Sequence, residues 1–124
     1  MGVEQGQLWQ EVSKKLSDEG RKYDDGKPRM CEMIQDFGIA LEEVARVWAF
    51  GADKYDKGNW RNLENAFDRY SNALVRHLVA EQYARVDAES GLYHAAHVAW
   101  NALARLHFLV LQANEEVENS IKNN

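Results

Sequence analysis

The sequence predicts an all-α protein, a small bundle of about four helices. Apolar residues recur with the period of an α-helix over most of the chain, and Pro28 is the only proline. No segment alternates apolar and polar residues as a half-buried strand does. The length of 124 residues predicts a single domain, residues 1–124. Because the last helix carries more apolar residues than one small core needs, we also expect a homo-oligomer.

The first 35 residues are expected to form a helix and a loop. An apolar stripe predicts an amphipathic helix within residues 1–19, ended by Gly20. Residues 20–35 combine glycines, the proline and mixed charge, which indicates a basic loop. In this loop Lys27 and Arg29 offer an ammonium and a guanidinium group, which suit phosphate oxygens. A solvated charged loop with no ligand is the alternative.

Residues 36–116 are expected to form the helical core. Four residues are candidate helix N-caps: Asp36, Asn62, and, for the final helix, Glu89 or Ser90. The first core helix should end near Asp56, where turn-forming residues follow. The polar tail, residues 117–124, is expected to fray.

The composition argues against several classes of protein. A net charge of −5 and a pI of about 5.3 oppose an extended surface for duplex nucleic acid. Cys31 is the only cysteine, so neither an intramolecular disulfide nor a multi-cysteine zinc site is possible. The N-terminus lacks an apolar signal region, and no apolar run approaches the length of a membrane span. We therefore expect a cytoplasmic protein without a membrane partner.

Histidines and carboxylates gather in a predicted helix–turn–helix. His77 and Glu81 are four residues apart and share one helical face. His94, His97 and Asn101 follow an i, i+3, i+7 pattern on the next helix. If the turn folds the two faces together, they can hold a divalent cation or the polar end of a ligand. The alternatives are a surface His–Glu pair, an exposed His94 and a hydrogen-bonded core His97.

Three further acids are candidates for the same site. Asp87 and Glu89 lie in the turn, where capping of the next helix is an equally good explanation. Glu43 lies on a mostly apolar strip and needs a partner there, which favours a functional role. Its neighbour Glu42 is four residues from Arg46, as in a surface ion pair.

The segment after the first core helix has groups suited to a nucleotide. Trp60 beside a turn can stack on a nucleobase, Asn59 can read a base edge, and Lys54 can neutralise phosphate. Simple packing of the helix junction is the alternative for Trp60.

Three blocks of sequence, in order, carry a resemblance to a known family. They are GRKYDDGKPRM, ALEEVARVWAFGADKYDKGNWRN and RYSNALVRHLVAEQYARVDAESGLYHAAHVAWNALARL. Together they resemble a phage-encoded family named for the N-terminal domain of dATP/dGTP diphosphohydrolase, distantly like the all-α MazG pyrophosphohydrolases. The MazG E-E-x-x-E pattern is incomplete, because Arg46 stands where its third glutamate would be.

The resemblance implies a divalent-metal-dependent enzyme, acting in the host cytoplasm, that hydrolyses purine deoxynucleoside triphosphates to monophosphate and pyrophosphate. The expected cofactor is Mg²⁺ or Mn²⁺. The expected metal ligands are Glu43, Glu81, Asp87, Glu89 and His94. The expected catalytic residues are Glu43, His77 and His97. The expected nucleotide-binding residues are Lys27, Arg29, Lys54, Asn59, Trp60 and Asn101.

Two other classes of function remain open. The same pocket could bind a nucleotide, such as a host second messenger, and sequester it without cleavage. The chain could also be a purely structural helical oligomer with Trp48 and Trp100 at the subunit contact, although the polar stripe would then have no role.

Overall fold

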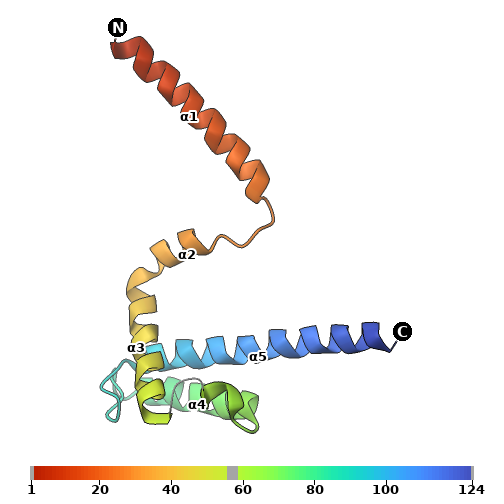
Figure 1. Ribbon diagram of the computed structural model, residues 1–124. Helices are drawn as coiled ribbons and strands as arrows, with labels where there is room; N and C mark the ends of the chain where they lie inside the picture. Colours follow the sequence, from red (N-terminus) through yellow and green to blue (C-terminus); the bar gives the residue numbers. More distant parts are fainter. Residues whose placement is uncertain (1, 56–58, 124) are drawn as a thin grey trace. The chain divides into compact units, whose positions relative to one another are not determined.

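The computed structural model describes residues 2–55 and 59–123, and these residues are helical almost throughout (Figure 1). The elements are α1 (Gly2–Asp24), α2 (Met30–Asp36), α3 (Gly38–Tyr55), the 3₁₀ helix η1 (Asn59–Asn62), α4 (Ala66–Glu81) and α5 (His94–Lys122). The all-α prediction is confirmed, but the described residues form five α-helices, not four. Their only extended pairing is an isolated bridge between Val86 and Tyr93. None of their helices is both long enough and apolar enough to cross a bilayer.

The chain divides into two units, residues 1–36 and residues 37–124, and each is described by itself. In the first unit the loop predicted over residues 20–35 is limited to residues 25–29. Helix α1 continues through Gly20 to Asp24, and α2 occupies most of the rest. One glycine inside a long helix costs only about 1 kcal/mol, which its neighbours can offset. The chain turns instead at Gly26, whose φ of 78° suits a residue without a side chain.

The predicted N-caps are also corrected. Asp36 ends α2, and the first hydrogen bond of the next helix runs from Leu41 N to Phe37 O. Asn62 closes η1, while Asn65 precedes α4 in a left-handed conformation without a side-chain cap. Tyr93 precedes α5, also without a side-chain cap, so neither Glu89 nor Ser90 caps that helix. The predicted turn at Lys57–Gly58 lies outside the described residues.

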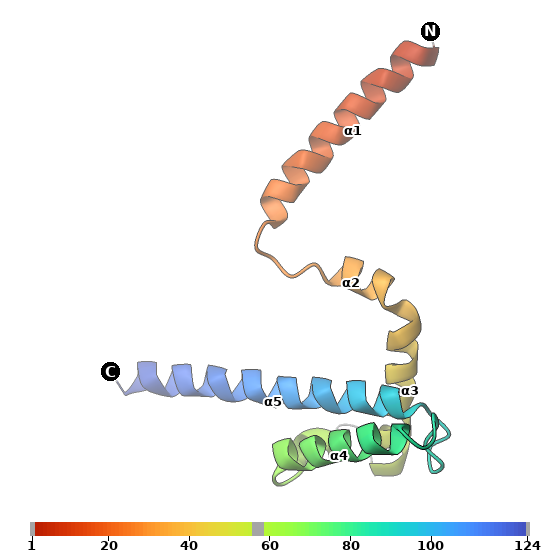
Figure 2. The ribbon, with the colours of Figure 1, turned by 180° about the vertical axis from the view of Figure 1, so that it is seen from behind.

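The second unit is built on the packing of α4 against α5. The two helices lie side by side in both views, and α3 contacts α5 as well (Figures 1 and 2). Ala66, Tyr70 and Ala104 are buried at the contact, with Trp60, Trp100 and Phe108 packed around them. The Tyr70 hydroxyl donates a hydrogen bond of 2.6 Å to the carbonyl of Trp60, which attaches η1 to this core.

Helix α5 extends well beyond the core. Residues 117–124 were expected to fray. This prediction is wrong for residues 117–122, because α5 continues through them and ends at Lys122. Along α5 runs a row of exposed apolar residues: Leu103, Leu106, Val110, Ala113 and Val117. We call this row the α5 seam. Its alternating spacing of three and four residues is that of a coiled-coil contact, and it lies away from the face that packs on α4.

We expect the α5 seam to mediate the predicted self-association. Val110→Glu places a charge in the middle of the seam, where pairing would have to bury it. In sedimentation at high concentration, the wild type should be a dimer or larger and the variant a monomer. Asn119→Glu adds the same charge half a turn around the helix and should leave the assembly unchanged. A strictly monomeric wild type would contradict this expectation.

Candidate functional site

The site is organised by the loop between α4 and α5. Backbone hydrogen bonds close this loop: Asp87 N donates to Leu92 O at 2.8 Å, and His94 N donates to Arg85 O at 3.0 Å. Gly91 makes the turn between them with a φ of 72°, a conformation that favours glycine. The loop therefore folds back on itself and brings Asp87 close to the start of α5.

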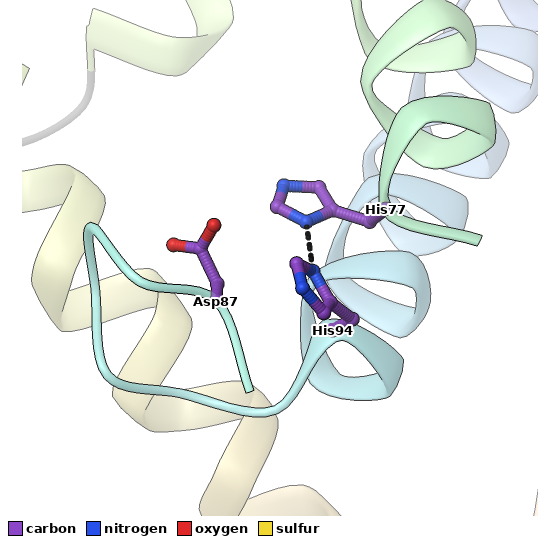
Figure 3. Close-up of side chains that lie close together, drawn as sticks. All are labelled: His77, Asp87 and His94. Carbon is purple, nitrogen blue, oxygen red and sulfur yellow. Dashed lines mark hydrogen bonds between the residues drawn. The ribbon is translucent and has the colours of Figure 1, made fainter. Parts of the chain in front are cut away.

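Three potential metal ligands from three segments meet at this point (Figure 3). They are His77 near the end of α4, Asp87 in the loop, and His94, the first residue of α5; one ligand atom of each lies within 4.8 Å of the others. The Nδ1 atoms of the two histidines are 2.9 Å apart and share a hydrogen bond, so one ring carries the proton. His94 is buried, and the other two side chains are half-buried.

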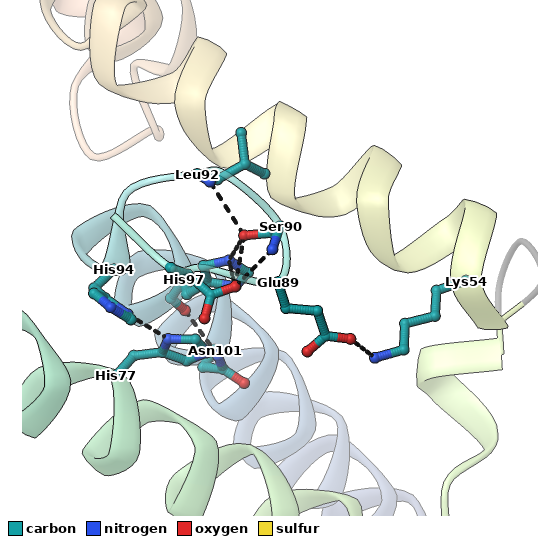
Figure 4. Close-up of polar contacts among 9 residues, drawn as sticks. Lys54, His77, Glu89, Ser90, Leu92, His94, His97 and Asn101 are labelled. Carbon is teal, nitrogen blue, oxygen red and sulfur yellow. Dashed lines mark hydrogen bonds and ion pairs between the residues drawn. The ribbon is translucent and has the colours of Figure 1, made fainter. Parts of the chain in front are cut away.

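Ser90, which lies between Leu92 and His97 (Figure 4), orients the acid of this cluster. Its backbone N–H and its hydroxyl donate to Oδ2 of Asp87 at 2.9 and 2.8 Å. Because the hydroxyl has only one proton, the contact of 2.8 Å with His97 Nε2 must run from the imidazole to Ser90 Oγ. Leu92 N donates to the same oxygen at 3.2 Å. The hydrogen-bonding capacity of Ser90 Oγ is thus fully used, and it holds His97 in the tautomer protonated at Nε2.

His97 is buried behind the cluster and fixed on several sides. Its ring stacks on that of His77, with centroids 4.2 Å apart and planes 5° from parallel. Its backbone carbonyl accepts a hydrogen bond of 2.7 Å from the Asn101 side chain. Burial, the largest cause, lowers the pKa of both histidines, and their mutual charge repulsion lowers that of His77 further. Both rings are therefore neutral at pH 7.

The electrostatics of the cluster favour a cation. Burial acts to raise the pKa of Asp87, but the two hydrogen bonds from Ser90 and the adjacent His97 and His77 bring it below the ordinary value. Asp87 is therefore ionised at neutral pH. An ionised carboxylate beside neutral imidazoles has a net negative charge and lone pairs that can bind a metal ion.

The cluster opens on a cavity of about 390 Å³ in the second unit. Its polar lining includes the arginines Arg69 and Arg76 of α4, together with Lys54, Asn59, His77, Asp87, Glu89, His97 and Asn101. Its aromatic lining is Trp48, Phe50, Trp60, Tyr70 and Trp100. The volume is in the range of small-molecule sites, and the lining combines flat apolar rings with groups that bind anions.

Most predicted site residues are brought together here, including all three histidines of the helix–turn–helix. His94 and His97 are both buried, so an exposed first-turn His94 is excluded. Glu89 lines the cavity, but its side chain is exposed and forms an ion pair with Lys54. Trp60 both lines the cavity and packs in the helix junction, with its ring 5.8 Å from that of Trp100. The two interpretations of Trp60 are therefore compatible.

Two predicted residues of the second unit lie outside the cavity lining, and two belong to the first unit, which is described by itself. Glu43 does not line the cavity and pairs with Arg46 at 2.8 Å, a partner that the sequence had suggested for Glu42. Glu81 is exposed at the end of α4, also outside the lining. Lys27 and Arg29 belong to the first unit, where Arg29 forms an ion pair with Glu32.

Sequence reasoning missed Ser90 as an orienting residue and both arginines of the cavity. The arginines could have been found, because Arg69, Arg76 and His77 recur at i, i+7 and i+8 and therefore share one face of α4. The role of Ser90 had no local signal, since it depends on how the loop closes.

The lowered histidine pKa values predict weaker folding in mild acid. Unfolded histidines titrate near 6.5, whereas the folded pKa values of His77 and His97 lie lower. As the pH falls from about 7, the unfolded chain binds protons first, so the free energy of unfolding decreases until the folded values are passed. Asp87 does not alter the free energy of unfolding over this pH range, because its carboxylate stays ionised.

The urea midpoint, measured with a chelator present, should therefore be lower at about pH 5.5 than at about pH 7.5. His97→Gln should reduce this difference. Equal wild-type midpoints at the two pH values would contradict the prediction.

Comparison with known proteins identifies the family. Residues 17–118 match the family described as dATP/dGTP diphosphohydrolase, N-terminal. A Salmonella phage PMBT28 protein named dATP/dGTP diphosphohydrolase is 41% identical over 81 residues, which are 64% of this chain and 26% of that protein. The chain thus spans about a quarter of the length of this relative. No solved structure matches the chain significantly. From the match over most of its length, the chain belongs to the dATP/dGTP diphosphohydrolase N-terminal family.

Proposed function

We propose that this chain hydrolyses purine deoxynucleoside triphosphates to the monophosphate and pyrophosphate. The observation that carries the proposal is a cavity lined together by arginines, by aromatic rings and by members of the His/Asp cluster. The name of the phage relative, dATP/dGTP diphosphohydrolase, supports the same reaction. A hydrolase of this kind needs phosphate binding, base binding and activation of water, and the cavity has groups for each.

Cationic side chains would bind the phosphates of the nucleotide, and aromatic side chains would bind its base. Arg69 and Arg76 line the cavity and are exposed to solvent. A guanidinium group can donate two parallel hydrogen bonds to the oxygens of one phosphate. The rings of Trp60 and Trp100 offer faces and edges for a purine, whose larger ring gains more from such contacts than a pyrimidine does. This difference supports purine over pyrimidine substrates.

The residues present fit the divalent cation that the family implies. Two imidazole nitrogens and one carboxylate are a common donor set, and His77, Asp87 and His94 would hold the ion. Bound there, it would neutralise triphosphate charge and lower the pKa of a coordinated water.

His97 is the best candidate for the base. It lines the cavity, lies outside the set of three ligands, and is neutral at pH 7 because burial lowers its pKa. Since its Nε2 proton is donated to Ser90, Nδ1 has the free lone pair. In the proposed reaction a water oxygen bonds to the α-phosphorus, the bond from that phosphorus to the leaving pyrophosphate breaks, and the proton of the water goes to His97.

The direct test is to incubate the full chain with each of the four dNTPs and Mn²⁺, then separate the products. We expect dATP or dGTP to give monophosphate and pyrophosphate, with little turnover of dCTP and dTTP. Tight nucleotide retention without turnover would instead indicate the sequestering function and refute the hydrolase. If the chain shows no nucleotide retention and no turnover, only a structural role is left.

A pair of variants tests whether the essential acid is Asp87, which the geometry of the site favours, or Glu43, which the sequence favours. Asp87→Asn keeps size but removes the charge and should lower turnover roughly a hundredfold or more. Glu43→Gln should change turnover by less than about tenfold, a difference of roughly 1.4 kcal/mol in the barrier, because Glu43 lies outside the cavity lining. Steady-state rates at saturating nucleotide give both values. The reverse order of effects would return the catalytic role to Glu43.

A further inference from the structure

We propose that His77, Asp87 and His94 form a binding site for a first-row transition-metal ion, which takes Co²⁺ more tightly than Mn²⁺ and Mn²⁺ more tightly than Mg²⁺. The catalytic use of this ion rests on the proposed function, but its binding does not. The ions implied by the family include Mg²⁺, whose preferred ligands differ from those assembled here.

The donor atoms carry the first part of the argument. Mg²⁺ prefers oxygen ligands and keeps several waters, whereas imidazole nitrogen favours Mn²⁺, Fe²⁺, Co²⁺, Ni²⁺ and Zn²⁺. Two of the three donors here are imidazoles. The oxygen-rich set expected for Mg²⁺ is not assembled among the described residues, since Glu43 pairs with Arg46 and Glu89 pairs with Lys54.

The spacing of the two imidazoles carries the second part. Their Nδ1 atoms are 2.9 Å apart. Two ligands at right angles around an ion about 2.1 Å from each nitrogen are separated by about 3.0 Å. Two ring nitrogens whose lone pairs face each other at this distance repel, so a hydrogen or a metal ion must lie between or beside them. A proton does so without metal, and a metal ion can replace that proton.

The surroundings hold the ligands in place before any ion binds. Ser90 fixes one carboxylate oxygen of Asp87 through two hydrogen bonds, and the ring of His97 stacks on that of His77. The backbone bond from His94 N to Arg85 O fixes the start of α5. Such supporting contacts raise metal affinity, because less freedom is lost on binding.

The test is calorimetric titration of the chelator-treated full chain with CoCl₂, MnCl₂ and MgCl₂, without nucleotide. We expect one ion per chain, with Co²⁺ bound at least tenfold more tightly than Mg²⁺ and Mn²⁺ between them, the order set by nitrogen ligation. The visible absorption of bound Co²⁺ should differ from that of the aqueous ion.

His94→Gln should lower the Co²⁺ affinity at least tenfold and abolish the spectral change. The matched control, His107→Gln, removes a histidine outside the cluster and should bind Co²⁺ as the wild type does. If circular dichroism shows that His94→Gln has lost its helices, Asp87→Asn is the second variant for the same measurement. Equal affinities for Mg²⁺ and Co²⁺, or unchanged Co²⁺ binding by a folded His94→Gln or Asp87→Asn, would overturn the proposal.

The two proposals fail separately. Selective Co²⁺ binding that His94→Gln removes, without turnover of any dNTP, would support the metal site and refute the hydrolase. Turnover that is as fast with Mg²⁺ as with Mn²⁺, together with unchanged Co²⁺ binding by folded His94→Gln, would refute the metal site and keep the hydrolase.

Discussion

The packing of α4 against α5 is the contact on which the rest of the second unit depends. At one end of this contact Tyr70 stacks on Phe108 with planes 13° apart, and its hydroxyl holds η1 through the carbonyl of Trp60. At the other end the same contact brings His77 against His94 and His97. The helices are therefore antiparallel, and the aromatic core at one end sets the spacing of the histidines at the other. Loss of this contact would disperse both the cavity and the cluster.

Polar groups inside a small protein need partners, and here Ser90 satisfies several of them. An unpaired buried polar group costs about 1–3 kcal/mol, so a buried histidine must be bonded or ligated. Ser90 accepts from His97 and Leu92 and donates to Asp87, which satisfies the imidazole, the loop and the carboxylate together. Among the described side chains no buried nitrogen or oxygen is left without a partner. The groups of the cluster thus satisfy one another through hydrogen bonds, and their remaining lone pairs can bind an ion.

The cavity places unlike groups at distances that one small molecule can span. Arginines of α4, aromatic rings of η1 and α5, and the acid of the loop all face a volume of about 390 Å³. Neighbouring positive and negative groups would normally pair and cancel, as Lys54 and Glu89 do at the rim. Asp87 is instead directed to Ser90 and the histidines. Arg69 and Arg76 line the same cavity, so their guanidinium groups can pair with an anionic ligand there.

The sequence by itself determined the helical class, the family and the histidines of the cluster, because each depends on local pattern: the 3.6-residue period, the order of the three sequence blocks and the spacing of the histidines. Helix ends were less predictable, since Gly20 and the polar tail have weak preferences that the neighbouring turns outweigh. Only the tertiary structure decided which acid joins the histidines. Asp87, Glu89 and Glu43 are equivalent as carboxylates, but the closure of the loop around Gly91 turns Asp87 inward, whereas Glu89 and Glu43 pair with nearby cations.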